Sequence, residues 1–370
     1  MRDGTRTRAG RDDASDVAFM RRALDLAARG LGETNPNPAV GCVVVRNGRV
    51  VGEAFHHRAG QPHAEVLALR QAGRRARGAT LYVNLEPCAH QGRTGPCAPL
   101  VAQAGVRRVV AAMRDPNRLV NGRGLRALRR AGVAVDTGTL EAEARLLNEP
   151  FVASASTRRP FVLLKAALTL DGRIATATGE SRWITSATQR RAARALRRRY
   201  DGVAVGIGTV LADDPILLPT PRLRRPFYRI VFDSSLRLPL RSRLVRSARS
   251  SPVWVLTRGG DPRKRARLER LGVAVIQLPG RGRVPPAVAL RELYARGLRS
   301  LMVEGGSELL GSFLADGLFD QVALFRAPLL MGGRRSRPAF GGPDRARLAD
   351  ALRLRPGPSL AGAETWYPKR

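Results

Sequence analysis

Residues 81–105 read LYVNLEPCAHQGRTGPCAPLVAQAG, and this stretch decides the fold of the first half of the chain. The apolar run ATLYVNL predicts a strand, and Pro87-Cys88 follows it directly. Cys97, after Pro96, begins a predicted helix over about 97–104. This succession of strand and helix is typical of a layered α/β domain.

The same alternation extends to both sides of this stretch. A predicted helix from Ser15 to Gly30 comes first, and the strand-like runs AVGCVVV and RVVGEAF follow, joined by the hairpin signal Asn47-Gly48. Helices over about 63–74 and 122–131 and the strands RRVVAAM and VAVDTG complete the pattern. We therefore predict an α/β domain over residues 15–150, preceded by a disordered tail over residues 1–14.

A second alternation begins after the small, polar stretch FVASASTRRP, which we predict to be a linker over residues 151–160. Strand-like runs recur from FVLLKAAL to QVALFRAPLL, with helices over about 186–199 and 286–296 and a last strand at ETWYP. This pattern predicts a second open α/β domain over residues 161–370.

The charge of the chain is strongly positive. Its 370 residues include 65 Lys and Arg against 30 Asp and Glu, a net charge of +35, and only three of the 65 are lysines. The arginines occur in nearly every segment, whereas a nucleic-acid binder usually gathers them into one stripe.

Three further features of the sequence indicate where in the cell the protein is located. No apolar run reaches the ~18 residues of a membrane-spanning helix, and the first residues lack the apolar core of a signal peptide. The chain has three cysteines, an odd number that does not suit a disulfide framework. We therefore predict a soluble cytoplasmic protein with no membrane partner.

One histidine and two cysteines form a candidate site for one Zn²⁺ ion: His63, Cys88 and Cys97. A catalytic zinc site uses three protein ligands and keeps a fourth position for water. Glu65, two residues after His63, would move a proton from that water to a leaving amine. This His-x-Glu…Pro-Cys pattern is that of zinc deaminases. Cys42, inside GCVVV, is interpreted as a core residue.

The spacing of the two cysteines distinguishes among zinc deaminases. Nucleoside and tRNA deaminases close the site with Pro-Cys-x-x-Cys, whereas eight residues separate Cys88 from Cys97. The stretch PCAHQGRTGPC resembles the deaminase half of the bifunctional riboflavin-biosynthesis deaminase–reductase family. Further motifs of that family occur in order: NPNPAVGCVVV at 35–45, GEAFHHRAGQPHAEV at 52–66 and DPN at 115–117.

The resemblance implies a cytidine-deaminase-like three-layer domain whose pocket holds an aminopyrimidine. It places four residues against the substrate besides Glu65: Asn37, His56, His90 and Arg93. An asparagine offers a donor and an acceptor to a heterocycle, and an arginine can neutralise a phosphate. Asn-Pro pairs also mark turns, so a purely structural role for residues 35–38 stays open. The chain departs from the family pattern at Gln91 and Gly95, neither of which is a ligand position.

The second half resembles the reductase half of the same family, which has a dihydrofolate-reductase-like fold and uses NADPH. The motifs that carry this resemblance are KAALTLDGRIA (165–175), GESRWIT (179–185), DGVAVGIGTVLADDP (201–215) and VEGGSELLGSFL (303–314). The resemblance implies cofactor contacts at Ala167, Trp183, Thr209, Asp213, Ser234, Gly306 and Ser307. It implies substrate contacts at Ser181, Arg197, Leu217 and Glu304.

Some roles in the second half stay open. Lys165 and Asp171 are candidates for positioning or proton supply, or for a structural ion pair. Where the family has an arginine that binds phosphate, this chain has Thr220, and Arg222 or Arg224 is the candidate replacement. From the residues alone, the glycine pair after SLMVE is only a weak signal for a phosphate site at a helix start.

The resemblance implies a two-step enzyme. The first domain would use zinc hydroxide to deaminate 2,5-diamino-6-(ribosylamino)pyrimidin-4-one 5′-phosphate, and the second would use NADPH to reduce the ribosyl group to ribityl. We also expect a phosphorylated small-molecule substrate, no nucleic-acid partner, and a homo-oligomer, either a dimer or a tetramer. The alternatives are a nucleic-acid-acting zinc deaminase with a basic binding domain, and a second domain without catalytic activity.

Overall fold

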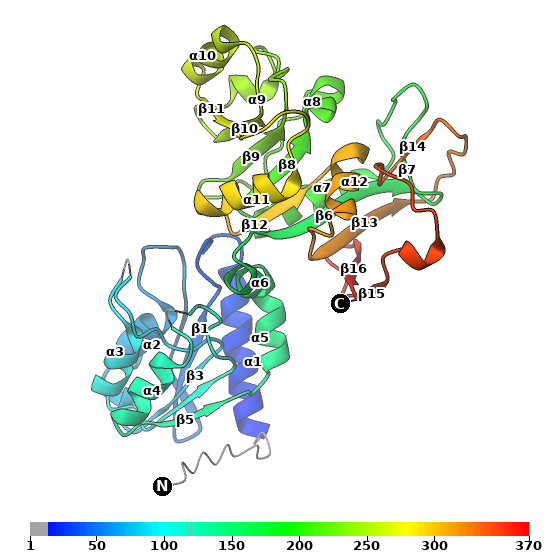
Figure 1. Ribbon diagram of the computed structural model, residues 1–370. Helices are drawn as coiled ribbons and strands as arrows, with labels where there is room; N and C mark the ends of the chain where they lie inside the picture. The colour runs from blue at the N-terminus through cyan, green and yellow to red at the C-terminus, as the bar shows by residue number, and fades with distance from the viewer. Residues whose placement is uncertain (1–13, 93, 119, 370) are drawn as a thin grey trace. The chain divides into compact units, whose positions relative to one another are not determined.

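The structure, a computed structural model, describes residues 14–92, 94–118 and 120–369. The chain forms two compact units with the boundary between Ser156 and Thr157 (Figure 1). Residues 1–13, most of the predicted disordered tail, lie outside the described residues. The described part of the chain has no helix that is both long and apolar enough to cross a membrane.

A five-stranded sheet in the order β2-β1-β3-β4-β5 forms the centre of the first unit. Its strands are β1 (Gly41–Arg46), β2 (Arg49–Phe55), β3 (Thr80–Val83), β4 (Arg108–Ala111) and β5 (Ala134–Thr137). The hairpin between β1 and β2 turns at Asn47 and Gly48, both with positive φ, as the Asn-Gly pair predicts. Strands β3, β4 and β5 are parallel, so their carboxyl ends lie at one edge of the sheet.

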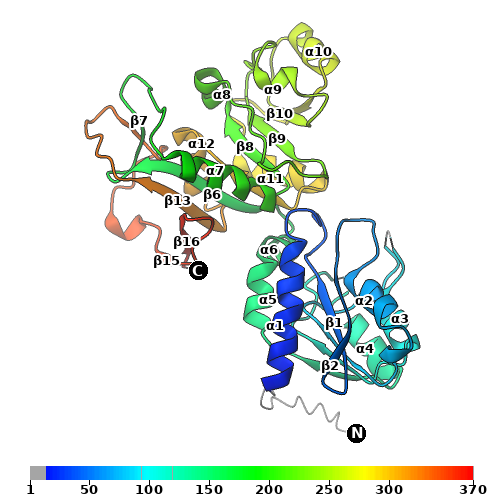
Figure 2. The same cartoon turned by 180° about the vertical axis from the view of Figure 1, so that it is seen from behind.

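Helices cover both faces of this sheet (Figures 1 and 2). One face carries α1 (Ala14–Arg29) and α5 (Glu141–Leu147); the other carries α2 (Ala64–Ala72), α3 (Cys97–Gln103) and α4 (Arg123–Arg130). Alternate residues of β1 supply the two cores: Val43 packs with α1, and Cys42 packs with α2 and α3. The predicted three-layer domain and the core position of Cys42 are confirmed.

A helix occupies most of the segment predicted as a linker. This helix, α6 (Glu149–Thr157), extends to within four residues of the next strand. Phe151 and Val152 pack against the same apolar cluster as α1, and Ser154 is buried. The small residues of this segment therefore form a packed helix, and Pro160 follows its end.

A nine-stranded sheet forms the second unit, in the order β11-β10-β9-β8-β12-β6-β13-β16-β15. The strands are β6 (Phe161–Thr169), β8 (Gly202–Gly206), β9 (Tyr228–Phe232), β10 (Val253–Thr257), β11 (Val273–Gln277), β12 (Ser300–Val303), β13 (Gln321–Ala327), β15 (Leu354–Pro356) and β16 (Glu364–Pro368). In this order each strand from β11 through β13 is parallel to the next, and β16 is antiparallel to β13. β7 (Arg173–Ala175) and β14 (Arg337–Pro338) pair separately.

Two apolar clusters lie on the two faces of this sheet. Helices α11 (Pro286–Ala295) and α12 (Ser307–Ala315) pack with Ala204 of β8 in one cluster. Helices α8 (Ile207–Asp213), α9 (Arg243–Arg246) and α10 (Pro262–Arg270) pack with Val203 and Val205 in the other. Helix α7 (Ala187–Leu196) begins with a capping box between Ser186 and Gln189. The helix ends at Leu196, earlier than the predicted residue 199, and the chain continues as a 3₁₀ turn, Arg197–Arg199.

Candidate functional sites

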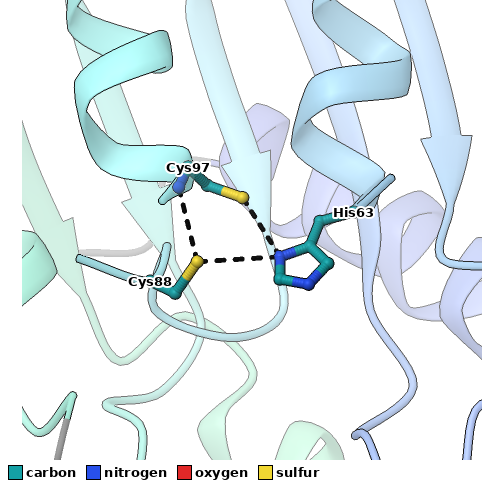
Figure 3. Close-up of side chains that lie close together, drawn as sticks. All are labelled: His63, Cys88 and Cys97. Carbon is teal, nitrogen blue, oxygen red and sulfur yellow. Dashed lines mark hydrogen bonds between the residues drawn. The ribbon is translucent and has the colours of Figure 1, made fainter. Parts of the chain in front are cut away.

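Three side chains from separate segments of the first unit converge on one point (Figure 3). His63 immediately precedes α2, Cys97 is the first residue of α3, and Cys88 lies in the loop after β3. One ligand atom from each lies within 4.8 Å of the others. His63 Nδ1 is 3.2 Å from Cys97 Sγ and 3.6 Å from Cys88 Sγ. The three residues predicted as metal ligands are therefore brought together.

The donor set and its spacing fit zinc. Imidazole and thiolate are the ligands that Zn²⁺ prefers, and tetrahedral bonds of about 2.0 Å to nitrogen and about 2.3 Å to sulfur separate such atoms by roughly 3.5 Å. The second ring nitrogen of His63, Nε2, lies 3.1 Å from Thr94 Oγ1. An N–H donated to that hydroxyl leaves the Nδ1 lone pair directed at the two sulfurs. Thr94 was not identified from the sequence, because only the folded loop brings it to His63.

The two thiols have opposite pKa shifts. Hydrogen bonding with Cys97 and with His63 lowers the pKa of Cys88 to about 4, although burial acts against this. The hydrogen bond with Cys88, together with burial, raises the pKa of Cys97. One negative charge is therefore held by the sulfur pair, and a divalent cation would favour the thiolate form of both.

Glu65 is a buried carboxyl beside this cluster. Its side chain is 3% exposed, and Oε2 has no hydrogen-bond partner within the described ranges. Burial raises the pKa of Glu65, although the neighbouring His63 acts in the opposite direction. A buried polar atom without a partner is costly unless it meets water or a substrate. This environment suits a group that accepts and releases a proton.

Two of the predicted substrate residues adjoin the metal ligands. The ring of His56 meets the ring of His63 edge-on, with centroids 5.2 Å apart, and Asn37 Nδ2 lies 3.2 Å from His56 Nε2. Burial lowers the pKa of His56, which keeps its ring neutral. The N–H of Asn37 also donates to the carbonyl of Thr34 at 2.9 Å, so the turn predicted by the Asn-Pro pairs is present as well.

The other two predicted substrate residues lie in the loop between the cysteines. His90 is partly buried, and its Nδ1 has no hydrogen-bond partner among the residues that the structure describes. Arg93 lies outside the described residues. Gln91 and Gly95, the two departures from the family pattern, are both exposed. His90 therefore keeps a donor or acceptor for a ligand.

In the second unit, predicted cofactor contacts gather at the carboxyl ends of parallel strands. Thr209 lies in α8 after β8, Ser234 follows β9, and Gly306 and Ser307 follow β12. A Cβ atom added to Gly306 would lie 3.3 Å from Thr209 Oγ1, so these strand ends approach closely. Gly305 has a φ of 123° and open space around it. Bare backbone before a helix start suits the phosphate groups of a dinucleotide.

The remaining predicted cofactor contacts are placed as follows. Ala167 lies within β6 and is partly buried. Asp213 ends α8, and its Oδ1 lies 3.3 Å from Arg182 Nε. Trp183 is 67% exposed, with the Arg190 guanidinium 4.2 Å from its ring centre. An exposed aromatic ring of this kind is free to cover a bound ligand.

A buried charge cluster contains two of the predicted substrate residues and Lys165. Arg197 Nη2 donates to Glu304 Oε2 at 2.8 Å, and Lys165 Nζ lies 4.0 Å from the same oxygen. Burial lowers the pKa of Lys165, an effect that Glu304 opposes. Burial would raise the pKa of Glu304, but Arg197 lowers it below its ordinary value. Arg197, in the 3₁₀ turn after α7, is 9% exposed, whereas Arg191 and Arg194 of α7 are exposed, which agrees with a site role rather than a solvated one for Arg197.

Asp171 is separate from this cluster. Its Oδ1 accepts hydrogen bonds from Thr169 Oγ1 at 2.6 Å and from the Met331 N–H at 3.0 Å, and its Oδ2 accepts one from the Gly332 N–H at 2.8 Å. These bonds lower the pKa of Asp171 to about 2. Asp171 therefore holds a turn as a carboxylate, and the counterion of Lys165 is Glu304.

The segment that departs from the family near Thr220 is exposed. Leu217 is 4% exposed, and the carbonyl of Leu218 accepts a hydrogen bond from Arg197 at 2.8 Å. Beyond it, Thr220, Arg222 and Arg224 are all exposed. Ser181, the remaining predicted substrate contact, is partly buried. The arginines offered as replacements are therefore accessible to a phosphate.

Comparisons with known protein families cover both halves of the chain. Residues 13–113 match the cytidine and deoxycytidylate deaminase zinc-binding region, and residues 160–362 match the RibD C-terminal domain. The chain is 46% identical to the riboflavin biosynthesis protein RibD of Aquifex aeolicus, over 86% of this chain and 88% of that protein. It is 42% identical to the RibD of Escherichia coli K12, over 91% of this chain and 94% of that protein.

Comparison with solved structures agrees with these family matches. The RibD of Acinetobacter baumannii has 39% sequence identity and a TM-score of 0.87, and the match covers 96% of this chain and 99% of that one. A diaminohydroxyphosphoribosylaminopyrimidine deaminase/5-amino-6-(5-phosphoribosylamino)uracil reductase of Thermotoga maritima has 35% identity, a TM-score of 0.83 and the same coverage. The predicted fold class of both domains is confirmed, and a nucleic-acid-acting deaminase is not favoured.

Proposed function

The chain belongs to the RibD family of riboflavin-biosynthesis proteins, and we propose which of its residues perform the two reactions of that family. It is a bifunctional enzyme that joins a zinc-dependent pyrimidine deaminase to an NADPH-dependent reductase. Its substrate is a phosphorylated small molecule. The reaction sequence is deamination of 2,5-diamino-6-(ribosylamino)pyrimidin-4-one 5′-phosphate, followed by reduction of the ribosyl group to ribityl.

His63, Cys88 and Cys97 would hold one zinc ion in each chain. A bound zinc ion lowers the pKa of its water to about 7 and so supplies a nucleophile at neutral pH. Glu65 would accept a proton from the attacking water and deliver it to the amino group that leaves the pyrimidine ring, so that water adds, ammonia departs and a carbonyl takes its place. Oε2 of Glu65, which has no hydrogen-bond partner among the described residues, lies beside the three converging ligands, and this observation carries the assignment.

Four residues would orient the aminopyrimidine. Asn37 presents an amide to the edge of the heterocycle, with its amide nitrogen held near His56 at 3.2 Å. His56 is neutral at physiological pH, because burial lowers its pKa, and His90 offers Nδ1. Arg93 would neutralise the ribose phosphate. Together these groups would hold the ring and its phosphate while Glu65 moves the proton.

In the second unit NADPH would supply the hydride when bound, and the protein supplies orientation. Ala167, Trp183, Thr209, Asp213, Ser234, Gly306 and Ser307 would bind NADPH. Ser181, Arg197, Leu217 and Glu304 would hold the substrate so that C1′ of its open-chain form faces the nicotinamide. Lys165 would provide the proton that balances hydride addition, because burial lowers its pKa. Asp171 would hold the turn at residues 331–332, and Arg222 would bind the 5′-phosphate in place of the arginine usual at residue 220.

We also propose a homo-oligomer, either a dimer or a tetramer, in the cytoplasm. Leu170, Leu329 and Leu330 of the second unit are 55%, 47% and 78% exposed, and the N–H of Leu170 donates to the carbonyl of Leu329 at 2.8 Å. Neighbouring exposed leucines favour contact with a second copy. Free thiols at the candidate zinc site and in the core suit a reducing compartment. Light scattering of the wild type beside Leu330→Glu measures the oligomeric state.

Metal analysis beside Cys88→Ser tests the central assignment. The expected result is one zinc per wild-type chain, with zinc and ammonia release lost in the variant. Because the second unit has its own site, the variant keeps NADPH oxidation on the deaminated substrate. A wild-type protein that is loaded with zinc and releases no ammonia would refute the deaminase assignment. Absence of NADPH oxidation in the wild type would support a catalytically silent second unit.

A further inference from the structure

Glu86 is a buried carboxylate two residues before the ligand Cys88. Its side chain is 3% exposed and accepts hydrogen bonds from four backbone N–H groups. Oε2 accepts from Asp115 at 3.2 Å and Gly122 at 2.8 Å, and Oε1 accepts from Gly124 at 2.9 Å and Leu125 at 3.3 Å. Hydrogen bonds to an ionised acceptor are among the stronger ones in proteins. One side chain therefore joins the end of β3 to the segment 115–125.

The start of α4 packs directly on the peptide that precedes Cys88. A Cβ atom added to Gly124 would lie 1.8 Å from the carbonyl oxygen of Pro87 and 3.3 Å from Glu86 Oε1. Only glycine permits this approach, because any side chain would displace the Pro87 carbonyl. Gly124 and Leu125 belong to the first turn of α4, where the helix dipole favours a negative charge such as that of Glu86.

Cys88 is held from its other side by α3. Its carbonyl accepts a hydrogen bond from the Ala98 N–H at 3.0 Å, and its Sγ accepts one from the Cys97 N–H at 3.3 Å. The short Pro87-Cys88 segment thus lies between the starts of two helices. The contacts with α3 come from the ligand itself, whereas those with α4 depend on Glu86 and Gly124.

We propose that Glu86, together with Gly124, is a positioning residue for the metal centre. It fixes the backbone of Cys88 so that its sulfur meets His63 and Cys97 before the ion arrives. Neither residue touches the ion. A ligand held in place loses less conformational freedom on binding, so the zinc affinity rises. This inference rests on the proposed function in that the ion is taken to be zinc.

Asp16 provides a matched control in the same unit. It is also a buried carboxyl, 6% exposed, and it accepts hydrogen bonds from Tyr82 Oη at 2.7 Å and Arg108 Nη2 at 2.6 Å. These bonds join α1 to β3 and β4 on the face of the sheet opposite α2, α3 and α4. Loss of Asp16 therefore weakens the fold of the unit without acting on the loop of Cys88.

The test compares zinc affinity in Glu86→Gln, Gly124→Ala and Asp16→Asn with that of the wild-type chain. Competition with a chelator gives the zinc dissociation constant, the cobalt(II)-loaded protein gives the thiolate absorption bands, and thermal melting gives the stability of each variant. We expect Glu86→Gln and Gly124→Ala to weaken zinc binding roughly 10- to 100-fold and to alter the cobalt spectrum. Asp16→Asn keeps the wild-type affinity and spectrum.

Two results would overturn the role of Glu86: zinc affinity unchanged in Glu86→Gln, or an equal loss in Asp16→Asn. If Glu86→Gln does not fold, Gly124→Ala, which keeps the carboxylate, decides the question by the same measurements. A wild-type chain that binds no zinc would overturn the metal assignment and this inference together. That outcome differs from the one in which the wild-type chain binds zinc and the variants bind it equally well.

Discussion

The two candidate centres bury charge in different ways. In the first unit, His63, Cys88 and Cys97 come together with no Lys or Arg side chain in contact with them among the described residues, and a buried carboxyl, Glu65, lies beside them. In the second unit, Glu304 lies between two cations, Arg197 and Lys165. The proposed zinc ion would balance thiolates in the first cluster, whereas the second is balanced by the chain itself. Loss of metal should therefore disable one activity and leave the other.

The sharpest way to separate the two centres is Glu65→Gln. Removing the proton-transfer group should lower ammonia release by about 10²- to 10⁴-fold, the usual contribution of general acid–base catalysis. Bound zinc and NADPH oxidation on the deaminated substrate should stay at wild-type levels. Asp25→Asn, an exposed carboxyl of the same unit, serves as the control. Ammonia release that survives in Glu65→Gln would contradict the assigned role.

Glu304→Gln tests the self-balanced cluster. Arg197 and Lys165 would remain buried without their counterion, which costs about 3–5 kcal/mol in the free energy of unfolding. All three tryptophans, Trp183, Trp254 and Trp366, lie in the second unit, so tryptophan fluorescence in urea follows that unit alone. The exposed pair Arg326–Glu364 offers a control, since Glu364→Gln should cost less than about 1 kcal/mol.

The same cluster predicts a pH dependence. The folded pKa of Glu304 lies below its ordinary value of 4.5, so its stabilisation is complete above pH 4.5 and is lost as the pH falls through the folded pKa. The second unit of Glu304→Gln should lack this acid-dependent loss. Equal acid sensitivity of the wild-type chain and of Glu304→Gln in the fluorescence experiment would show that Glu304 does not contribute to this loss of stability.

Asp115 gives the first unit a pH dependence of the opposite sign. Burial raises its pKa to about 7, so the folded state holds a proton that the unfolded chain releases near pH 4. Stability of the first unit should therefore fall as the pH rises from 5 to 7, at most by about 1.4 kcal/mol per pH unit. Asp115→Asn should remove this slope, and hydrogen exchange of β3 and β4 measures it. An unchanged slope of stability against pH in Asp115→Asn would show that another titrating group causes it.

Arg222→Ala, compared with Arg224→Ala, tests the altered phosphate segment and is expected to have the smallest effect. Loss of one exposed contact to a phosphate should raise the KM for the reductase substrate about tenfold, or ~1.4 kcal/mol. The KM for NADPH should not change. A larger effect of Arg224→Ala would move the assignment to that residue, and no effect of either would remove both from the site.

Short sequence motifs were sufficient to identify the three residues that the structure brings together as candidate zinc ligands. His63 and Cys97 stand at helix starts and Cys88 follows a strand, so local structure orients each of them. Thr94 and Glu86 were not predicted, because their partners, His63 Nε2 and the N–H groups of residues 115–125, come from segments with no periodic link to them. The helix over residues 149–157 was not predicted either, because its apolar contacts with the core are not visible in a polar stretch.

The sequence by itself therefore determined the main alternation of strands and helices, the division into two α/β units and the chemistry of the candidate ligand set, since these depend on side-chain type and short spacing. Only the tertiary structure decided which groups meet. Parallel pairing of β3 with β4 brings four backbone N–H groups to Glu86, and the neighbouring strands β8, β12 and β6 bring Glu304 to Arg197 and Lys165. Contacts across strands are set by sheet order and register, which residue spacing along one chain does not encode.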